Sequence, residues 1–103
     1  MKTFEDCFRR IIRLTDERLA HILEHWEMQG MEDELERVLQ QPVVVRRSHS
    51  DKTVWLFYRF YTQTPVGGKW LCVLVKLVED DAFVVTAYLT DKLKAGEDLW
   101  LTH

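Results

Sequence analysis

The apolar positions of this chain follow two different periods. Between residues 16 and 40 they recur at three- and four-residue intervals, which is typical of helices that bury one stripe. From residue 43 onward they form runs rich in Val, Leu, Phe, Tyr and Trp, separated by turn-forming segments. Such runs are typical of consecutive antiparallel strands. The pattern therefore predicts helices first and a sheet second.

Two helices are predicted, over residues 16–28 and 31–40. Thr15 is a good N-cap for the first helix, and acidic residues in the first turn of each helix favour the helix dipole. Gly30 separates the helices, and Pro42 ends the second. We expect six side chains to be buried between the helices and the sheet: Leu23, Trp26, Leu35, Leu39, Val73 and Val85.

Four antiparallel strands are predicted, over residues 43–49, 53–61, 69–78 and 82–90. Pro65 and the pair Gly67-Gly68 indicate a loop between the second and third strands, because they fix one backbone angle and permit unusual ones nearby. The fold class is therefore predicted to be α+β, with two N-terminal helices packed on one face of a four-stranded antiparallel sheet.

Three segments lie outside this framework. Residues 9–14 suit a first edge strand or an extended lead-in. Residues 91–97 suit a turn or a single helical turn closed by Gly96, and residues 99–101 are predicted to dock back onto the domain. With 103 residues and no repeat or linker, we expect one domain over residues 1–103.

Charge is distributed unevenly along the chain. The formal net charge of −3 argues against binding of a polyanion over the whole surface. Residues 1–40 carry ten acidic and six basic side chains, whereas residues 41–103 carry seven acidic and eight basic ones. Three of those seven acids are adjacent, at residues 79–81, so the rest of the sheet region is locally basic. This asymmetry permits an anion site on the sheet.

Composition predicts neither a metal nor a cofactor. The two cysteines are too few for a disulfide framework, and no His or Cys cluster has metal-ligand spacing. Cys72 lies within an apolar run and is interpreted as a reduced core thiol. The chain has no apolar run of about 18 residues and no apolar signal core at its start, which predicts a cytoplasmic protein outside the membrane.

A family pattern is carried by five segments, which read LTDERLAHILEHWEM, VVVRRSHSD, LFYRFY, TPVGGKWLCVLVK and AFVVTAYLTDKLKAGE. In order and spacing these segments resemble the phage-type nuclease group of the barnase, EndoU, colicin and RelE-like superfamily, over residues 11–100. The resemblance implies a small, toxin-like endonuclease that cleaves RNA without a metal, by attack of the 2′-OH on the adjacent phosphate. RNA would be the substrate, and an inhibitory or immunity protein a partner.

Cleavage of this kind needs a base, an acid and cations that stabilise the charge on the phosphorane. His25 is the candidate base or acid, because the resemblance places a helix histidine in the HxxxH pattern; a solvated helix histidine is the alternative. Arg59 interrupts an aromatic strand, where a charge is costly unless it is paired or reaches the surface. Alternation puts Thr86 and Tyr88 on one face of the last strand. We expect one cleft of four catalytic residues: His25, Arg59, Thr86 and Tyr88.

Three further cations are predicted to bind the substrate: Arg46, Lys76 and Lys92. Lys92 resembles the family's terminal basic residue, with a surface lysine as the alternative. The strand registers that decide whether Arg59 and Lys76 share the Tyr88 face are not fixed by the sequence. The alternative function is a non-catalytic RNA- or protein-binding module on the same fold, which the acidic pI and the absence of a second strong acid/base pair leave open.

Overall fold

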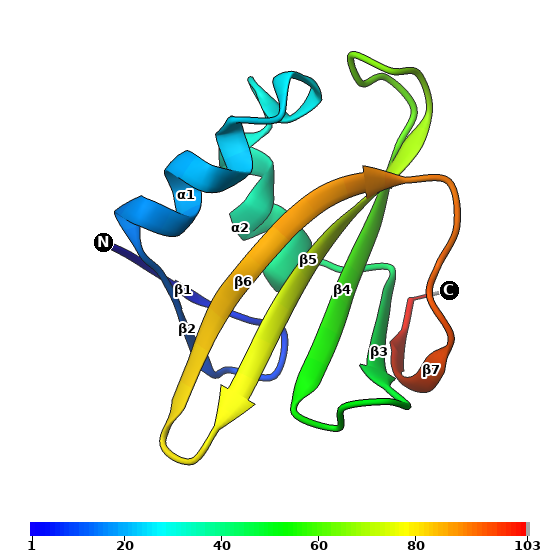
Figure 1. Cartoon of the computed structure of the whole chain (residues 1–103). Helices are drawn as coiled ribbons and strands as arrows, with labels where there is room; N and C mark the ends of the chain where they lie inside the picture. Colours follow the sequence, from blue (N-terminus) through cyan, green and yellow to red (C-terminus); the bar gives the residue numbers. More distant parts are fainter. Residues whose placement is uncertain (103) are drawn as a thin grey trace.

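The chain begins with a short β-hairpin, ahead of the helices and the main strands (Figure 1). The computed structural model describes residues 1–102. The described helices are too short and too polar to span a bilayer. Over residues 1–102 the elements are β1 (Lys2–Glu5), β2 (Ile11–Leu14), α1 (Asp16–Leu23), the 3-10 helix η1 (Trp26–Met28), α2 (Glu32–Gln40), β3 (Val44–Ser48), β4 (Val54–Tyr61), β5 (Lys69–Val78), β6 (Asp81–Thr90) and β7 (Gly96–Leu101).

The sheet is larger than predicted and of a different kind. Its strands, seven within the described range, run in the order β1-β2-β6-β5-β4-β3-β7, so the prediction of a four-stranded antiparallel sheet is wrong. The strands β3 to β6 do form the predicted antiparallel meander. However, β2 joins β6 in parallel through the pair Arg13 and Phe83, and β7 joins β3 antiparallel. The sheet is therefore mixed, and strands from both ends of the sequence extend it.

A buried carboxylate holds the turn between β1 and β2. Asp6 is 4% exposed, and its Oδ1 accepts hydrogen bonds from the backbone N–H groups of Phe8 and Arg10 at 2.9 and 2.8 Å. The Arg10 guanidinium pairs with Asp6 Oδ2 at 3.0 Å and lies 4.1 Å from the centre of the Trp55 ring. This carboxylate tolerates burial because backbone and charged donors replace water. Arg9 completes the turn with a positive φ of 65°.

The last strand begins at a glycine that lies against β3. A Cβ on Gly96 would lie 2.6 Å from the Arg47 carbonyl oxygen, so a larger residue would force β7 away from β3. Asp98 pairs with Arg46 at 2.7 Å, and Glu97 pairs with Arg47 at 2.5 Å. Gly96 therefore opens a strand and does not close a helical turn. Residues 99–101 dock back onto the domain as expected, as part of an edge strand.

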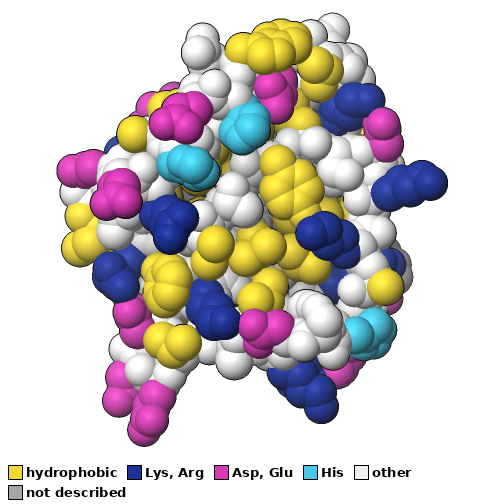
Figure 2. All heavy atoms as spheres, in the orientation of Figure 1, with side chains coloured by type: hydrophobic (Ala, Val, Ile, Leu, Met, Phe, Trp, Pro, Cys, Tyr) yellow, Lys and Arg dark blue, Asp and Glu magenta, His cyan; other side chains and the backbone are white. Residues whose placement is uncertain are grey.

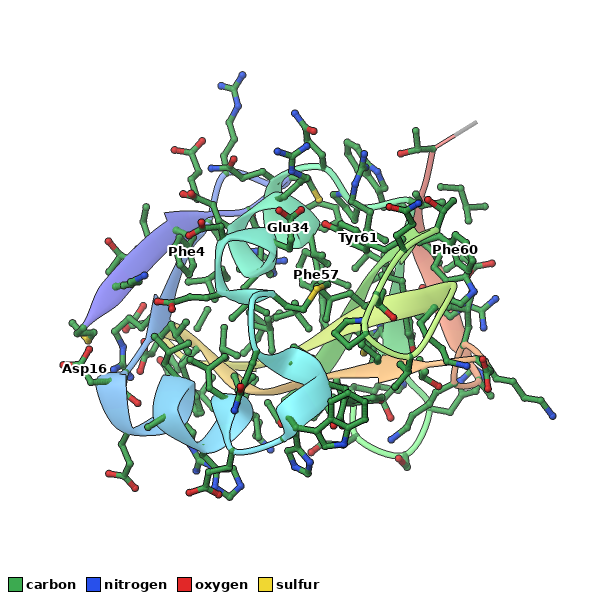
Figure 3. The ribbon with its side chains drawn as sticks, turned by 90° about the horizontal axis from the view of Figure 1, so that it is seen from above. Phe4, Asp16, Glu34, Phe57, Phe60 and Tyr61 are labelled. Carbon is green, nitrogen blue, oxygen red and sulfur yellow. The ribbon has the colours of Figure 1, made fainter. Side chains whose placement is uncertain are left out.

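Both helices pack on the same face of the sheet (Figure 1). α1 lies over β6, and α2 lies over β4, β5 and β1. Figure 3 shows Phe57 in this interior and Tyr61 beside Glu34, whose Oε1 accepts a hydrogen bond from the Tyr61 hydroxyl at 2.8 Å. Three of the predicted core residues are fully buried in this layer: Leu35, Leu39 and Val73.

The predicted burial of Trp26 is wrong. α1 ends at Leu23, and the chain continues as the tighter helix η1, which changes the direction in which successive side chains point. Trp26 is 63% exposed, and Leu23 is half-buried. Val85 is also half-buried, because it is the extra residue of a β-bulge between Val84 and Thr86.

Candidate functional site

The sheet face turned away from both helices carries a second apolar cluster, and we call this surface the open face. The strand pairing shows which side chains share this face. Tyr58 in β4 lies opposite Cys72 in β5, and Cys72 lies opposite Tyr88 in β6. Figure 2 shows hydrophobic side chains gathered over the central strands, with Lys and Arg side chains among them. The cluster consists of the buried Val44, Leu56, Tyr58 and Cys72 and the half-buried Val43, Val54, Trp70, Leu74, Tyr88 and Leu93.

Three aromatic rings lie side by side on the open face. The Trp70 ring is 5.3 Å from that of Phe60 and 6.4 Å from that of Tyr58, and both contacts are edge-to-face. Phe60 is 46% exposed although its side chain is large and apolar. Rigid aromatic side chains of this kind are common anchors of protein interfaces, because they bury much area at a small cost in conformational entropy.

The connection between β6 and β7, residues 91–95, crosses one side of the open face. The Lys94 backbone N–H donates a hydrogen bond to the Tyr58 hydroxyl at 3.0 Å, and Arg46 Nη1 donates to the Lys94 carbonyl at 2.9 Å. Lys94 Nζ lies 5.6 Å from the centre of the Tyr88 ring, and Leu93 packs against the apolar cluster. The segment therefore covers Tyr58 and part of Tyr88 and leaves Trp70 half-exposed.

Burial keeps one thiol and two phenols beneath this segment in their protonated forms. It raises the pKa of the Cys72 thiol to about 11, the pKa of Tyr58 to about 12 and the pKa of Tyr88 well above its usual range. The Tyr88 hydroxyl is buried and has no hydrogen-bond partner among residues 1–102, although the Cys72 thiol lies beside it. A thiol is only a weak donor, so it does not replace one. A tyrosine hydroxyl with so high a pKa is a poor proton donor or acceptor in a reaction at neutral pH.

Most cations of the open face are already paired with carboxylates. Arg13 binds Asp81 through two hydrogen bonds, at 2.9 and 2.6 Å, and holds the pKa of that carboxyl below its usual range. Lys76 pairs with Asp51 at 3.0 Å. Hydrogen bonds from the Thr53 hydroxyl and then from Lys76 lower the pKa of Asp51 to about 2. These pairs cancel much of the positive charge that the sequence placed here.

The two predicted cations that lie on this face are both engaged. Arg46 and Lys76 are on the open face with Thr86 and Tyr88, because Arg46 lies opposite Leu56 and the ladder continues to Leu74 and Thr86. Arg46 binds Asp98, and Lys76 binds Asp51, so neither is available to a phosphate without losing its partner. Lys92 lies in the crossing segment and is exposed.

The predicted cleft of four catalytic residues does not form. Arg59 lies opposite Leu71, a core residue beneath the helices, so its side chain is on the sheet face opposite to Thr86 and Tyr88. Its Nη1 donates a hydrogen bond to the Gln41 carbonyl at 2.7 Å, which ties it to the end of α2. Thr86 and Tyr88 do share one face, as predicted.

His25 is exposed at the surface of the molecule. It is the residue before η1, its side chain is 64% exposed, and its Nδ1 lies 3.8 Å from the Glu27 carboxylate. A histidine in this position meets water on most of its surface. The solvated alternative describes it better than a base held against a substrate.

Of the apolar cluster on the open face, only Tyr88 was part of the predicted site. Trp70 and Leu74 fall within the strand predicted over residues 69–78, and Lys94 within the predicted turn over residues 91–97, and none of the three was predicted to belong to a site. One signal was present in the sequence, because residues 71–75 are apolar at every position, and a strand of that kind buries side chains on both of its faces. The packing of residues 91–95 against Tyr58 and Tyr88 had no local signal.

Comparison with known proteins gives no family assignment. No family model matches the sequence, no curated protein resembles it, and no solved structure resembles its fold. Within the described part of the chain, no group of three or more His, Cys, Asp or Glu side chains is arranged to hold a metal ion. The chemistry of the open face therefore has to be judged from its own residues.

Proposed function

We propose that this chain is a non-catalytic protein-binding module whose binding surface is the open face. The observation that carries the proposal is an apolar sheet face on which Arg13, Arg46 and Lys76 are already paired with carboxylates of the same chain. A cytoplasmic location is part of the proposal. The site supports this function better than RNA cleavage, because the predicted guanidinium lies on the opposite sheet face from Tyr88 and the predicted base is exposed to solvent.

The ion pairs on the open face make it better suited to binding a protein than a nucleic acid. Binding to RNA or DNA draws its affinity from free Lys and Arg side chains that displace counterions from phosphates. On the open face Arg13, Arg46 and Lys76 each have a carboxylate partner within 3.0 Å. A weakly charged, apolar protein surface would leave these pairs intact, whereas a polyanion would have to compete for them.

The aromatic rings and the size of the molecule fit such a partner. Trp70, Phe60 and Tyr88 would supply the central anchors, and the ion pairs around them would form a polar rim. The molecule measures 35 × 32 × 23 Å. Its broad side is large enough for the area of about 800 Å² per partner that a stable complex buries.

Site-specific crosslinking in the native host would identify the partner. A photoreactive phenylalanine at Phe60 should crosslink one protein, and the same group at Ala20, exposed on α1, should not. The captured protein would then be purified and its binding measured by calorimetry. Phe60→Asp should weaken binding roughly tenfold or more, whereas Val66→Asp, an exposed apolar position in the β4–β5 loop, should leave it unchanged.

Three results would overturn the proposal. Crosslinks from Phe60 to a second copy of the chain would show a homodimer surface, and crosslinks to nucleic acid would show an RNA-binding face. Cleavage of total RNA by the purified protein, in the presence of EDTA and absent from His25→Ala, would support the ribonuclease hypothesis. Thermal unfolding of Phe60→Asp would establish that the variant keeps its fold.

A further inference from the structure

A slot opens where β2 and β6 separate, and we call it the β2–β6 slot. The two strands pair only at Arg13 and Phe83, and the turn held by Asp6 precedes the start of β2. The cavity between them has a volume of about 420 Å³. Figure 1 shows that the β1–β2 loop and the β5–β6 turn lie at the same end of the molecule. A cavity of this size suits a small ligand or one long side chain.

The walls of the β2–β6 slot are mainly apolar. Four aliphatic side chains line it: the buried Ala82, the half-buried Leu77 and the exposed Ile11 and Val78. Ile11 is 59% exposed and Val78 is 45% exposed, which is high for large aliphatic side chains on two strands that only β6 separates. In Figure 2 hydrophobic side chains lie directly above the acidic tip of the β5–β6 hairpin. These side chains offer a hydrophobic contact that the chain itself does not cover.

Only one of the charged groups around the slot lacks a partner of opposite charge. Arg10 is paired with the buried Asp6, and Asp81 is paired with Arg13. Asp80 lines the slot and takes part in no ion pair among the described residues. The slot therefore combines an apolar wall with one uncompensated negative charge at its rim.

We propose that the β2–β6 slot binds a primary alkylammonium group, from the side chain of a lysine or from a free alkylamine. The methylene chain would lie along Ile11, Val78 and Leu77, and the ammonium would reach Asp80. Lysine side chains commonly bury their stems on apolar surface in this way while the charge stays near water. A carboxylate ligand would be repelled by Asp80, and a short polar ligand would leave the aliphatic walls uncovered. This site is separate from the open-face function, so either one can fail alone.

Methyl NMR with hexylammonium chloride tests the slot directly. Hexylammonium should shift the methyl signals of Ile11 and Val78 in a saturable way in the millimolar range and leave Val66, in the distant loop, unshifted. Hexanol should bind more weakly, and hexanoate should bind least. A blocked lysine, N-acetyl-lysine methylamide, distinguishes a lysine side chain from a free alkylamine as the natural ligand. Methyl shifts equal to those caused by hexylammonium indicate a lysine side chain. Smaller methyl shifts indicate a free alkylamine. Equal affinity for hexanoate, or no saturable shift of either methyl, would overturn the proposal.

A pair of neighbouring carboxylates provides the matched variants. Asp80→Asn removes the charge from the rim and suits the local backbone, because asparagine tolerates the positive φ of 61° found there. It should weaken hexylammonium binding about two- to fivefold, as expected for an exposed ion pair. Glu79→Gln removes the same charge from the adjacent residue, which does not line the slot. Equal losses from both variants, or no loss from Asp80→Asn, would show that Asp80 does not select the cation.

Discussion

The same substitution at two neighbouring tyrosines should change stability in opposite directions. Tyr58 and Tyr88 lie on either side of Cys72 on the open face, and both phenols are covered by residues 91–95. The Tyr58 hydroxyl accepts a hydrogen bond from the Lys94 N–H, whereas the buried Tyr88 hydroxyl has no such partner in residues 1–102. Replacing either residue with phenylalanine removes one oxygen and leaves the ring in place.

The magnitudes follow from the cost of burying a polar group. A buried hydroxyl that makes no hydrogen bond costs about 1–3 kcal/mol, so Tyr88→Phe should raise the free energy of unfolding by about 1 kcal/mol. For a chain of this length that gain corresponds to a rise of roughly 4–8 °C in Tm. Tyr58→Phe removes a formed hydrogen bond, and should lower the free energy of unfolding by about 0.5–1.5 kcal/mol.

Urea denaturation followed by circular dichroism would measure both effects. The slope of the transition should be unchanged in each variant, because neither changes the surface exposed on unfolding. The reasoning fails if Tyr88→Phe is destabilising by as much as Tyr58→Phe. That result would mean that the Tyr88 hydroxyl has an energetically significant partner, and the Cys72 thiol would then be the group to test with Cys72→Ala.

Two further predictions concern the turns. Arg9→Gly should raise the free energy of unfolding by about 0.5–1 kcal/mol. A positive φ costs a non-glycine residue about 1–2 kcal/mol, and the greater entropy of glycine in the unfolded chain offsets part of that gain. Ala20→Gly, in helix α1, should lower the free energy of unfolding by about 1 kcal/mol in the same urea denaturation assay. The lowered pKa of Asp51, about 2, stabilises the fold above pH 4, and this contribution is lost as the pH falls towards 2. Asp51→Asn should therefore be less stable than the parent at pH 7 and nearly equal to it at pH 2, and an equal deficit at both values would contradict this.

The central part of the fold was predictable because its signals are local. In the helix over Glu32–Gln40 and in the three long strands, the spacing of the apolar residues alone identifies the element. Pro, Gly or acidic turns mark the ends of these elements. The outer strands have no such signal. The four residues of β1, KTFE, contain a single apolar side chain, and the pairing of β2 with β6 depends on residues far apart in the sequence.

The predicted cleft of four residues does not form for a related reason, since it depended on how separate elements pair and not on local periodicity. Thr86 and Tyr88 were placed on one face correctly, because alternation within one strand is a local property. Relating Arg59 to Tyr88 required the registers of two hairpins, and a shift of one residue in either reverses the face. His25 was displaced when α1 ended at Leu23, since a helix that stops one turn early no longer points its next residues at the same neighbours.

The parallel pairing of β2 with β6 also sets an order of assembly. Arg13 and Phe83 are 70 residues apart, whereas β4, β5 and β6 follow one another through short turns. Closing the longer loop costs more chain entropy, so the meander should form before the N-terminal hairpin docks on it. Pulse-labelling hydrogen exchange during refolding should protect β5 before β2, and simultaneous protection would exclude this order. On the ribosome, the β1–β2 hairpin is synthesised well before β6, and it would then join the sheet only after β6 has emerged.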